Sequence, residues 1–176
     1  MEKVFKLRKL PLWGRQASAD EINFQWPTED LLSSLPEDVK LESLHFKRNS
    51  DYGPLGYVKV TLSNGMASPE FCKPNSSREI EMAPCRFDPR RPVRSVQGDD
   101  SKGSVPFVKS LTFLDERDYE VGAYNPKRLP RSGTTHVLKE NEELIGVYGV
   151  SHEKQSFSAF GFIVKVTLLQ RKSASY

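Results

Sequence analysis

The chain has few of the residues on which disulfide and metal chemistry depend. Its 176 residues include two cysteines and three histidines. Cys72 and Cys85 are too few for a disulfide framework, and we expect two free thiols in a reducing compartment, with a Cys72–Cys85 pair as the alternative. The histidines are scattered at His45, His136 and His152, without the spacing of metal ligands. We therefore expect no metal and no cofactor.

Long hydrophobic runs are also absent. No stretch approaches the roughly eighteen apolar residues of a membrane span. The apolar residues at the start of the chain are interrupted by Lys6, Arg8 and Lys9, so that no secretory signal is visible. We expect an intracellular protein, cytoplasmic or cytoskeletal, with a mitochondrial location as the alternative because the first residues are basic.

Catalytic fingerprints are missing as well. The sequence contains no P-loop, no dinucleotide-binding glycine motif, no zinc-protease motif and no nucleophile elbow. Asp99 and Asp100 are adjacent, followed by Ser101 and Lys102, and solvated loop charge explains this pair better than catalytic carboxylates do. We interpret the chain as non-enzymatic.

Turn residues and alternating apolar residues are abundant instead. Twelve prolines and eleven glycines favour turns and short strands over long helices. Ser63-Asn64-Gly65 predicts a hairpin turn, because Asn-Gly tolerates positive φ. Loops are expected at residues 84–95, 97–104 and 125–134. The predicted strands are short and antiparallel, at residues 41–48, 55–62, 78–82, 93–96, 107–114, 119–124 and beyond.

The clearest pattern lies near the C-terminus, in ELIGVYG (143–149) and FSAFGFIVKVTL (157–168). From Phe162 onward, apolar residues alternate between two faces, as in a strand buried on one side. Gly146, Gly149 and Gly161 interrupt these runs, and glycine within a strand marks a bulge, a bend or a close backbone approach. An ordinary β-sandwich is the alternative interpretation.

Four segments in this order, VKSLTFL (108–114), YEVGAY (119–124), ELIGVYG (143–149) and SAFGFIVKV (158–166), resemble the jacalin-like lectin family. The resemblance implies an all-β fold, a β-prism of three antiparallel sheets over residues 41–170. It is preceded by a mostly irregular N-terminal extension (1–40) with one or two short helices, and followed by a polar tail (171–176).

The resemblance also implies a sugar site, built from an N-terminal glycine pair and an acidic residue just before the last glycine-bearing strand. Ser158 occupies the position of that acid, and a hydroxyl is an uncharged, weaker acceptor. Candidate sugar-binding residues around these two places are Asp51, Gly53, Gly56, His152, Glu153, Gln155 and Ser158.

The extension 1–40 carries opposed blocks of charge, about +4 over residues 1–17 and about −6 over residues 18–42. One short amphipathic helix is expected before Pro11, and a second at 29–34, with Thr28 as its N-cap. Because a polar arm must bury its large aromatic side chains somewhere, we expect it to anchor on a partner. The expected anchors are Phe5, Leu7, Trp13, Phe24 and Trp26, together with the loop arginines Arg86, Arg90 and Arg91.

Polar chain ends are mobile unless something ties them down, so we expect the arm and the tail to be ordered by neighbouring chains. The leading hypothesis is a non-catalytic structural or adaptor subunit of a larger assembly, whose partners are other protein subunits. On this hypothesis, deletion of residues 1–30 leaves the β domain folded.

The alternative is a carbohydrate-binding lectin whose partner is a glycan. A nucleic-acid partner is disfavoured, because the basic loops lack interleaved aromatic side chains.

Overall fold

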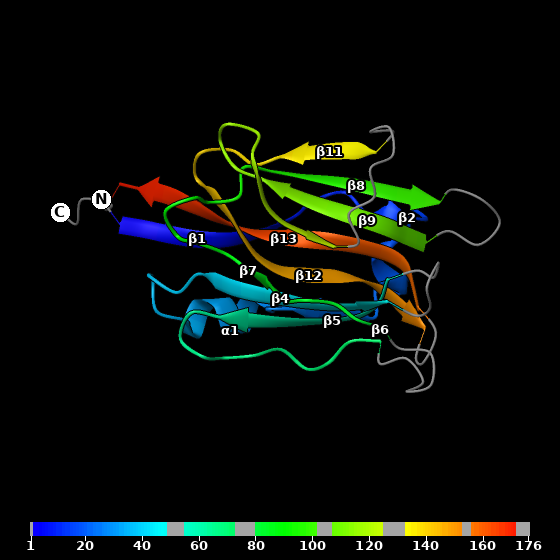
Figure 1. Ribbon diagram of the computed structural model, residues 1–176. Helices are drawn as coiled ribbons and strands as arrows, with labels where there is room; N and C mark the ends of the chain where they lie inside the picture. The colour runs from blue at the N-terminus through cyan, green and yellow to red at the C-terminus, as the bar shows by residue number, and fades with distance from the viewer. Residues whose placement is uncertain are drawn as a thin grey trace.

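In the part of the chain that the structure describes, thirteen strands form three antiparallel sheets, accompanied by two short helical segments (Figure 1). The computed structural model describes residues 2–48, 55–72, 80–101, 107–124, 133–152 and 156–171. Over these residues no helix is both long enough and apolar enough to cross a membrane.

The first sheet joins the two ends of the chain. Its longest strand, β13 (Ser156–Gln170), lies between β1 (Glu2–Lys9) and β12 (Glu142–His152). The short strand β3 (Phe24–Trp26) pairs with β12, and β2 (Trp13–Gly14) pairs with the first part of β13. N-terminal residues therefore supply three of the five strands of this sheet.

The second sheet is built from one continuous part of the chain. Strand β4 (Leu41–Arg48) pairs with β5 (Leu55–Leu62) on one side, and with β6 (Ile80–Glu81) and β7 (Cys85–Arg86) on the other. The predicted turn follows β5, where Gly65 has a φ of +88°. The strands predicted at 41–48 and 55–62 are thus confirmed.

The third sheet is equally local in sequence. Its order is β10 (Glu120–Tyr124), β9 (Phe107–Leu114), β8 (Ser95–Ser101) and β11 (Thr134–Val137). The predicted flexible loop at 97–104 is wrong over Gln97–Ser101, which pairs with β9 along its length.

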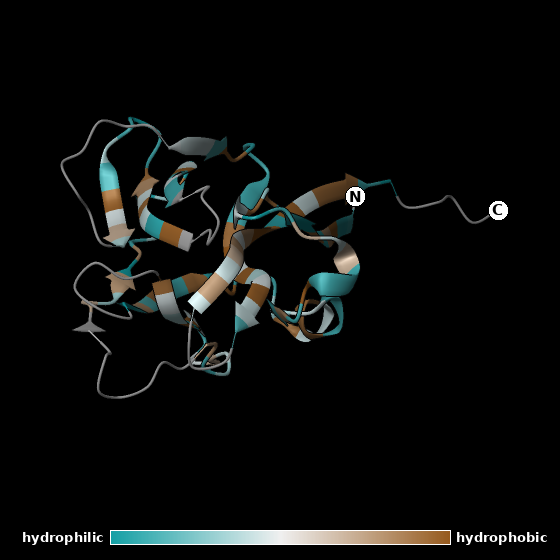
Figure 2. Cartoon of the chain, turned by 90° about the vertical axis from the view of Figure 1, so that its right-hand side faces the viewer, coloured by the Kyte–Doolittle hydropathy of each residue, from teal (hydrophilic) through white to brown (hydrophobic). Residues whose placement is uncertain are grey.

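The inner faces of the three sheets meet in an aromatic cluster. Phe46 of the second sheet lies 6.4 Å from Phe113 of the third, ring centre to ring centre, and 6.5 Å from Phe160 of the first. Phe162 completes the contact at 5.4 Å from Phe113, and all four side chains are buried. Figure 2 shows the alternation of hydrophobic and hydrophilic residues along strands that gives each sheet one inward face.

The N-terminal segment confirms one expected helix and corrects the other. Helix α1 (Glu29–Ser34) begins where predicted, with the Thr28 hydroxyl accepting a hydrogen bond from the Leu31 N–H at 3.2 Å. A 3-10 turn, η1 (Ala19–Glu21), precedes it. Glu2–Lys9, however, is a strand paired with β13 and not a short amphipathic helix, because the pairing satisfies the backbone groups that face β13 and packs Leu7 against the core.

Candidate functional site

Gly14 and Ser158 lie side by side at one end of the first sheet. Gly14 is the last residue of β2, and the next N–H, that of Arg15, donates a hydrogen bond of 2.9 Å to the Ser158 carbonyl. A Cβ on Gly14 would sit 2.4 Å from the same carbonyl oxygen, and its φ is +87°, so that only glycine fits here without strain. The glycine that meets the acid position of the resemblance is therefore Gly14, and its chain neighbour is an arginine rather than a second glycine.

A carboxylate from the third sheet reaches the same place. The Gly14 N–H donates a 2.6 Å hydrogen bond to Oδ2 of Asp100, near the end of β8 (Figure 1). Asp100 is half-buried, and this is the one hydrogen bond that the described residues give to its carboxylate. Sequence reasoning assigned Asp100 to a solvated loop; only the pairing of sheets brings it beside Gly14.

Ser158 itself offers little to a ligand through its side chain. Its hydroxyl oxygen is buried and has no hydrogen-bond partner among the described residues. Two further buried nitrogens, Nε1 of Trp13 and Nε2 of His136, find no hydrogen-bond partner in the described parts of the chain, and they belong to rings whose centres are 4.5 Å apart. Burial lowers the pKa of His136, which favours the neutral imidazole beside Trp13.

The predicted sugar-binding residues are only partly described. Asp51, Gly53, Glu153 and Gln155 lie outside the described residues. Gly56 is buried in β5 of the second sheet, whereas Ser158 belongs to β13 of the first. His152, the exposed last residue of β12, pairs with Ser156, and its carbonyl accepts a hydrogen bond from the Cys72 thiol at 3.3 Å. Cys72 and Cys85 are both buried thiols and are not joined in a disulfide.

The aromatic residues of the arm lie in the core of this chain. Trp13, Phe24 and Trp26 keep 1%, 7% and 9% of their surface exposed. Phe24 packs on Phe157 at 5.1 Å between ring centres. These three side chains therefore cannot anchor a partner, which corrects the expectation drawn from the sequence: sheet pairing carries them inward.

The two other expected anchors of the arm are half-buried on β1. The ring of Phe5 lies 5.1 Å from the Lys165 ammonium group, and Leu7 packs against the core. Neither forms an exposed apolar anchor.

Of the three arginines expected to anchor a partner, two are exposed and one holds the loop in place. Arg86 is exposed, and the Arg90 side chain is 89% exposed while pairing with Asp88 at 3.2 Å. Arg91 instead binds Asp115 at 3.0 Å and so ties the loop to the third sheet. Burial disfavours the charge on Asp115, but hydrogen bonds from Arg91 and from backbone N–H groups hold its pKa below the usual value.

No metal site accompanies these residues. Among the described residues, no three His, Cys, Asp or Glu side chains gather closely enough to hold a metal ion. Around Gly14 the chemistry is that of hydrogen-bond acceptors and N–H donors, which suits recognition of hydroxyl groups. The exposed guanidinium groups of Arg86 and Arg90 belong to a different part of the molecule and suit acidic surfaces.

Comparison with models of known protein families gives no match, and comparison with curated proteins gives none either. Solved structures do match. AcmJRL, a mannose-binding jacalin-related lectin from Ananas comosus, superposes with a TM-score of 0.54 and 19% identity, over 90% of this chain and 96% of that one.

Two further lectins superpose equally well. A prostate-specific glycoprotein lectin, WGA16, gives a TM-score of 0.57 at 13% identity, over 90% of this chain and 99% of that one. Calsepa lectin in complex with a biantennary N-glycan gives 0.57 at 12%, over 92% and 96%. At such identities the likeness establishes the fold alone. The chain has the jacalin-like β-prism fold that the four sequence segments predict, and it has diverged far from these lectins in sequence.

Proposed function

We propose that this chain is a non-catalytic carbohydrate-binding module, in which Asp100 supplies the carboxylate that Ser158 cannot. The observation that carries the proposal is the 2.6 Å hydrogen bond from the Gly14 N–H to Asp100, beside Ser158. It brings together an acid and a tight glycine turn, the two features that the jacalin-like resemblance associates with a sugar site.

The chemistry of this group suits hydroxyl-rich ligands. An ionised carboxylate accepts several hydrogen bonds through its two oxygens, and those from hydroxyl groups are strengthened by its charge. The Gly14 N–H uses Oδ2 and leaves Oδ1 to accept from a ligand. That bond also fixes the carboxylate, so less rotational freedom is lost on binding. The lectin likeness supports this reading, since one of the superposed proteins is a mannose-binding lectin and another carries a bound N-glycan.

A glycan array followed by calorimetry tests the proposal. The wild-type chain is screened first, and each hit is titrated against Asp100→Asn and, as the matched control, Asp99→Asn on the same strand. Asparagine keeps an oxygen for the Gly14 N–H but removes the charge, so we expect affinity to fall about tenfold or more for Asp100→Asn alone. An array without hits, or equal losses in the two variants at unchanged thermal stability, would overturn the proposal.

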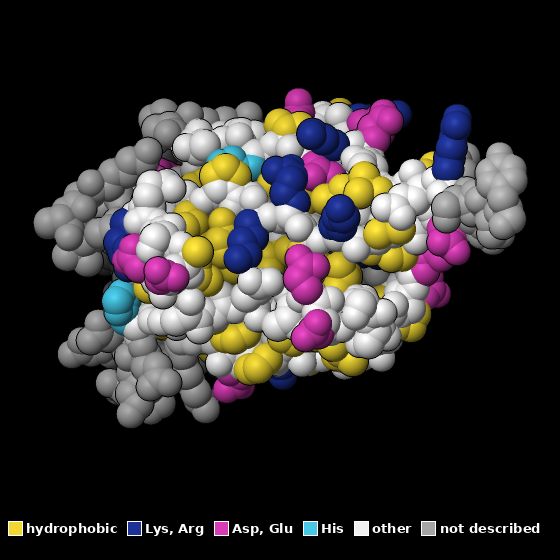
Figure 3. All heavy atoms as spheres, turned by 180° about the vertical axis from the view of Figure 1, so that it is seen from behind, with side chains coloured by type: hydrophobic (Ala, Val, Ile, Leu, Met, Phe, Trp, Pro, Cys, Tyr) yellow, Lys and Arg dark blue, Asp and Glu magenta, His cyan; other side chains and the backbone are white. Residues whose placement is uncertain are grey.

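A second candidate is an adaptor that binds other protein subunits, the role for which an intracellular, cytoplasmic or cytoskeletal location is expected. Its support is the exposed pair Arg86 and Arg90 around the β7–β8 connection, since exposed guanidinium groups suit acidic partner surfaces. On the face seen in Figure 3, Lys and Arg are interspersed with Asp and Glu and do not form a continuous basic stripe, which disfavours nucleic acid as the partner.

The adaptor candidate is tested in complexes purified from native material. A chain carrying Arg86→Glu and Arg90→Glu should no longer co-purify with its partner chains, while its thermal unfolding stays unchanged. Co-purification at the wild-type level would rule out this loop as the docking surface.

A further inference from the structure

A pocket opens at the opposite end of the prism from Gly14. Its walls come from the beginnings of three strands, one per sheet: Leu41 starts β4, Glu142 starts β12, and Arg94 directly precedes β8. Asp100 lies five residues beyond Ser95 on β8, about 17 Å along the strand. The pocket is thus separate from the proposed sugar site.

The proline-rich segment between β7 and β8 forms the remaining wall. Pro89 and Pro92 line the pocket together with Phe87 and Val93. Phe87 is held by an edge-to-face contact with Phe113 of the core, at 5.3 Å and 80°. The pocket volume is about 130 Å³, and its lining combines apolar residues with the charged residues Lys40, Asp88, Arg94, Glu142 and Glu143. A dry apolar cavity of roughly this size, about 150 Å³, is large enough to hold a benzene ring.

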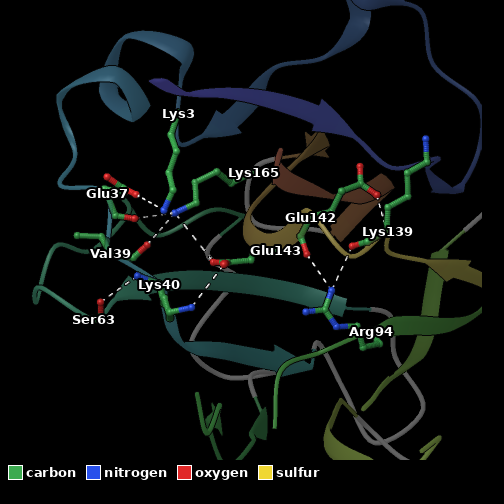
Figure 4. Close-up of polar contacts among 10 residues, drawn as sticks. All are labelled: Lys3, Glu37, Val39, Lys40, Ser63, Arg94, Lys139, Glu142, Glu143 and Lys165. Atoms are coloured by element: carbon green, nitrogen blue, oxygen red, sulfur yellow. Dashed lines mark hydrogen bonds and ion pairs between the residues drawn. The ribbon is translucent and has the colours of Figure 1, made fainter. Parts of the chain in front are cut away.

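The carboxylates around the pocket are already paired with cations. Glu142 is 1% exposed and accepts two hydrogen bonds from Arg8, of 2.5 and 2.8 Å. Glu143 lies 3.4 Å from the Lys40 ammonium and 4.0 Å from that of Lys165 (Figure 4). The third carboxylate at the pocket, that of Asp88, pairs with Arg90 at 3.2 Å. None of these groups calls for a cationic ligand.

Arg94 is the exception among the charged groups of the pocket. Its Nη1 donates to the backbone carbonyls of Lys139 and Glu142, at 3.1 and 3.3 Å, and the described residues offer it no carboxylate (Figure 4). The two carbonyls hold the guanidinium in place without neutralising it. A guanidinium carries five N–H donors in a flat fork that matches a carboxylate, so the remaining donors can receive one.

We infer that this pocket binds a small ligand made of a carboxylate on a flat apolar group, a benzoate-like acid. The apolar part would lie between Leu41, Phe87 and Pro92, and the carboxylate would bind Arg94. The same chemistry is found in a free aromatic acid and in a peptide whose C-terminal residue is aromatic. Both sources present one carboxylate next to one ring.

Titration followed by NMR tests this inference on the full chain, with benzoate and its uncharged analogue benzamide as probes. We expect millimolar binding of benzoate, as befits so small a ligand, and about tenfold weaker binding of benzamide. Arg94→Gln should weaken benzoate binding about tenfold, whereas Arg86→Gln, an exposed arginine of β7 outside the pocket lining, should leave it unchanged.

Further variants separate loss of charge from loss of fold. Arg94→Lys keeps the charge without the fork and should bind benzoate between wild type and Arg94→Gln, at equal thermal stability. N-acetyl-phenylalanine binding more tightly than benzoate would indicate a peptide C-terminus, and weaker binding would indicate a free acid. Equal binding of benzoate and benzamide, no binding of either, or an equal loss in Arg86→Gln would overturn the inference. None of these results depends on whether Asp100 binds sugar.

Discussion

The first sheet differs from the other two in where its strands come from. The second sheet is built within residues 41–86 and the third within 95–137, so each folds from neighbouring segments of the chain. The first sheet pairs residues 2–26 with residues 142–170. It closes the molecule by joining both ends, and it carries Gly14 and Ser158 of the candidate sugar site. Contacts so distant in sequence form only after a large loss of chain entropy. We therefore expect the stability of the first sheet to depend strongly on the presence of each of its strands.

Removing the N-terminal arm should destabilise the fold more than any other change considered below, because the first sheet depends on it. Deletion of residues 1–30 takes away β1, β2 and β3, and with them the buried rings of Trp13, Phe24 and Trp26. We expect loss of the cooperative thermal transition, followed by circular dichroism, because each large buried ring contributes about 3–5 kcal/mol. This reverses the expectation from sequence that the β domain folds without the arm. A truncated chain with a native-like, cooperative transition would contradict it.

The ion pair between Arg8 and Glu142 should be the next largest contribution, because it ties β1 to the start of β12. Arg8→Met leaves a buried carboxylate without its cation. We expect the free energy of unfolding to fall by about 2 kcal/mol, less than the roughly 3–5 for fully buried pairs, because the Arg8 side chain is 41% exposed. Lys3→Met is the control. Lys3 lies on β1, like Arg8, but its ion pair with Glu37 is exposed, so the substitution should leave urea unfolding almost unchanged.

The same pair predicts a pH dependence. The hydrogen bonds from Arg8 hold the pKa of Glu142 below its usual value in the folded chain. A carboxyl with a depressed folded pKa stabilises the fold above its unfolded pKa, and this contribution is lost as the pH falls below about 4.5. Urea unfolding should show that the free energy of unfolding falls less between pH 7 and pH 3 in Glu142→Gln than in wild type. An equal loss in both would exclude this origin.

The smallest expected effects come from two glycine-to-alanine substitutions, one in the first sheet and one in the second. A Cβ on Gly146 would sit 2.0 Å from the Trp26 carbonyl oxygen, where the arm strand β3 meets β12. Gly146→Ala must move that strand and should cost about 2–3 kcal/mol of unfolding free energy. Gly65→Ala in the local turn of the second sheet meets no atom within 4 Å, but keeps a φ of +88°, so about 1 kcal/mol is expected. The reverse order of the two values would show that the arm contact is soft.

The alternation of apolar and polar residues predicted most strands of the second and third sheets, which are each built from neighbouring segments of the chain. Residues 41–48, 55–62 and 107–114 alternate clearly, and each forms the predicted strand. The segment 2–9 was misassigned because its apolar residues suit one face of a helix as well as one face of a strand. Its partner, β13, lies more than 150 residues away in the sequence, and short-range periodicity carries no information about such a partner.

The candidate site shows the same division. Ser158 was found because a motif beside it in sequence pointed to it. Asp100 and Gly14 were missed as a pair because they are 86 residues apart and belong to different sheets. A positive φ at Gly14 is a backbone property that the letters WGR do not reveal. The pocket beside Arg94 was likewise invisible, although its proline-rich wall stood out in the sequence.

By itself, the sequence determined that the chain is all-β, that its C-terminal hairpin has a buried face, and that its segment order is that of a jacalin-like β-prism. These properties follow from alternation and turn chemistry, which act between residues close in the chain. Only the tertiary structure decided that the arm completes the first sheet, that its aromatic side chains lie in the core, and that the Asp100 carboxylate lies beside Gly14. The physical reason is that alternation specifies which face of a strand is buried, whereas the choice of partner strand depends on backbone pairing and apolar burial summed over the whole chain.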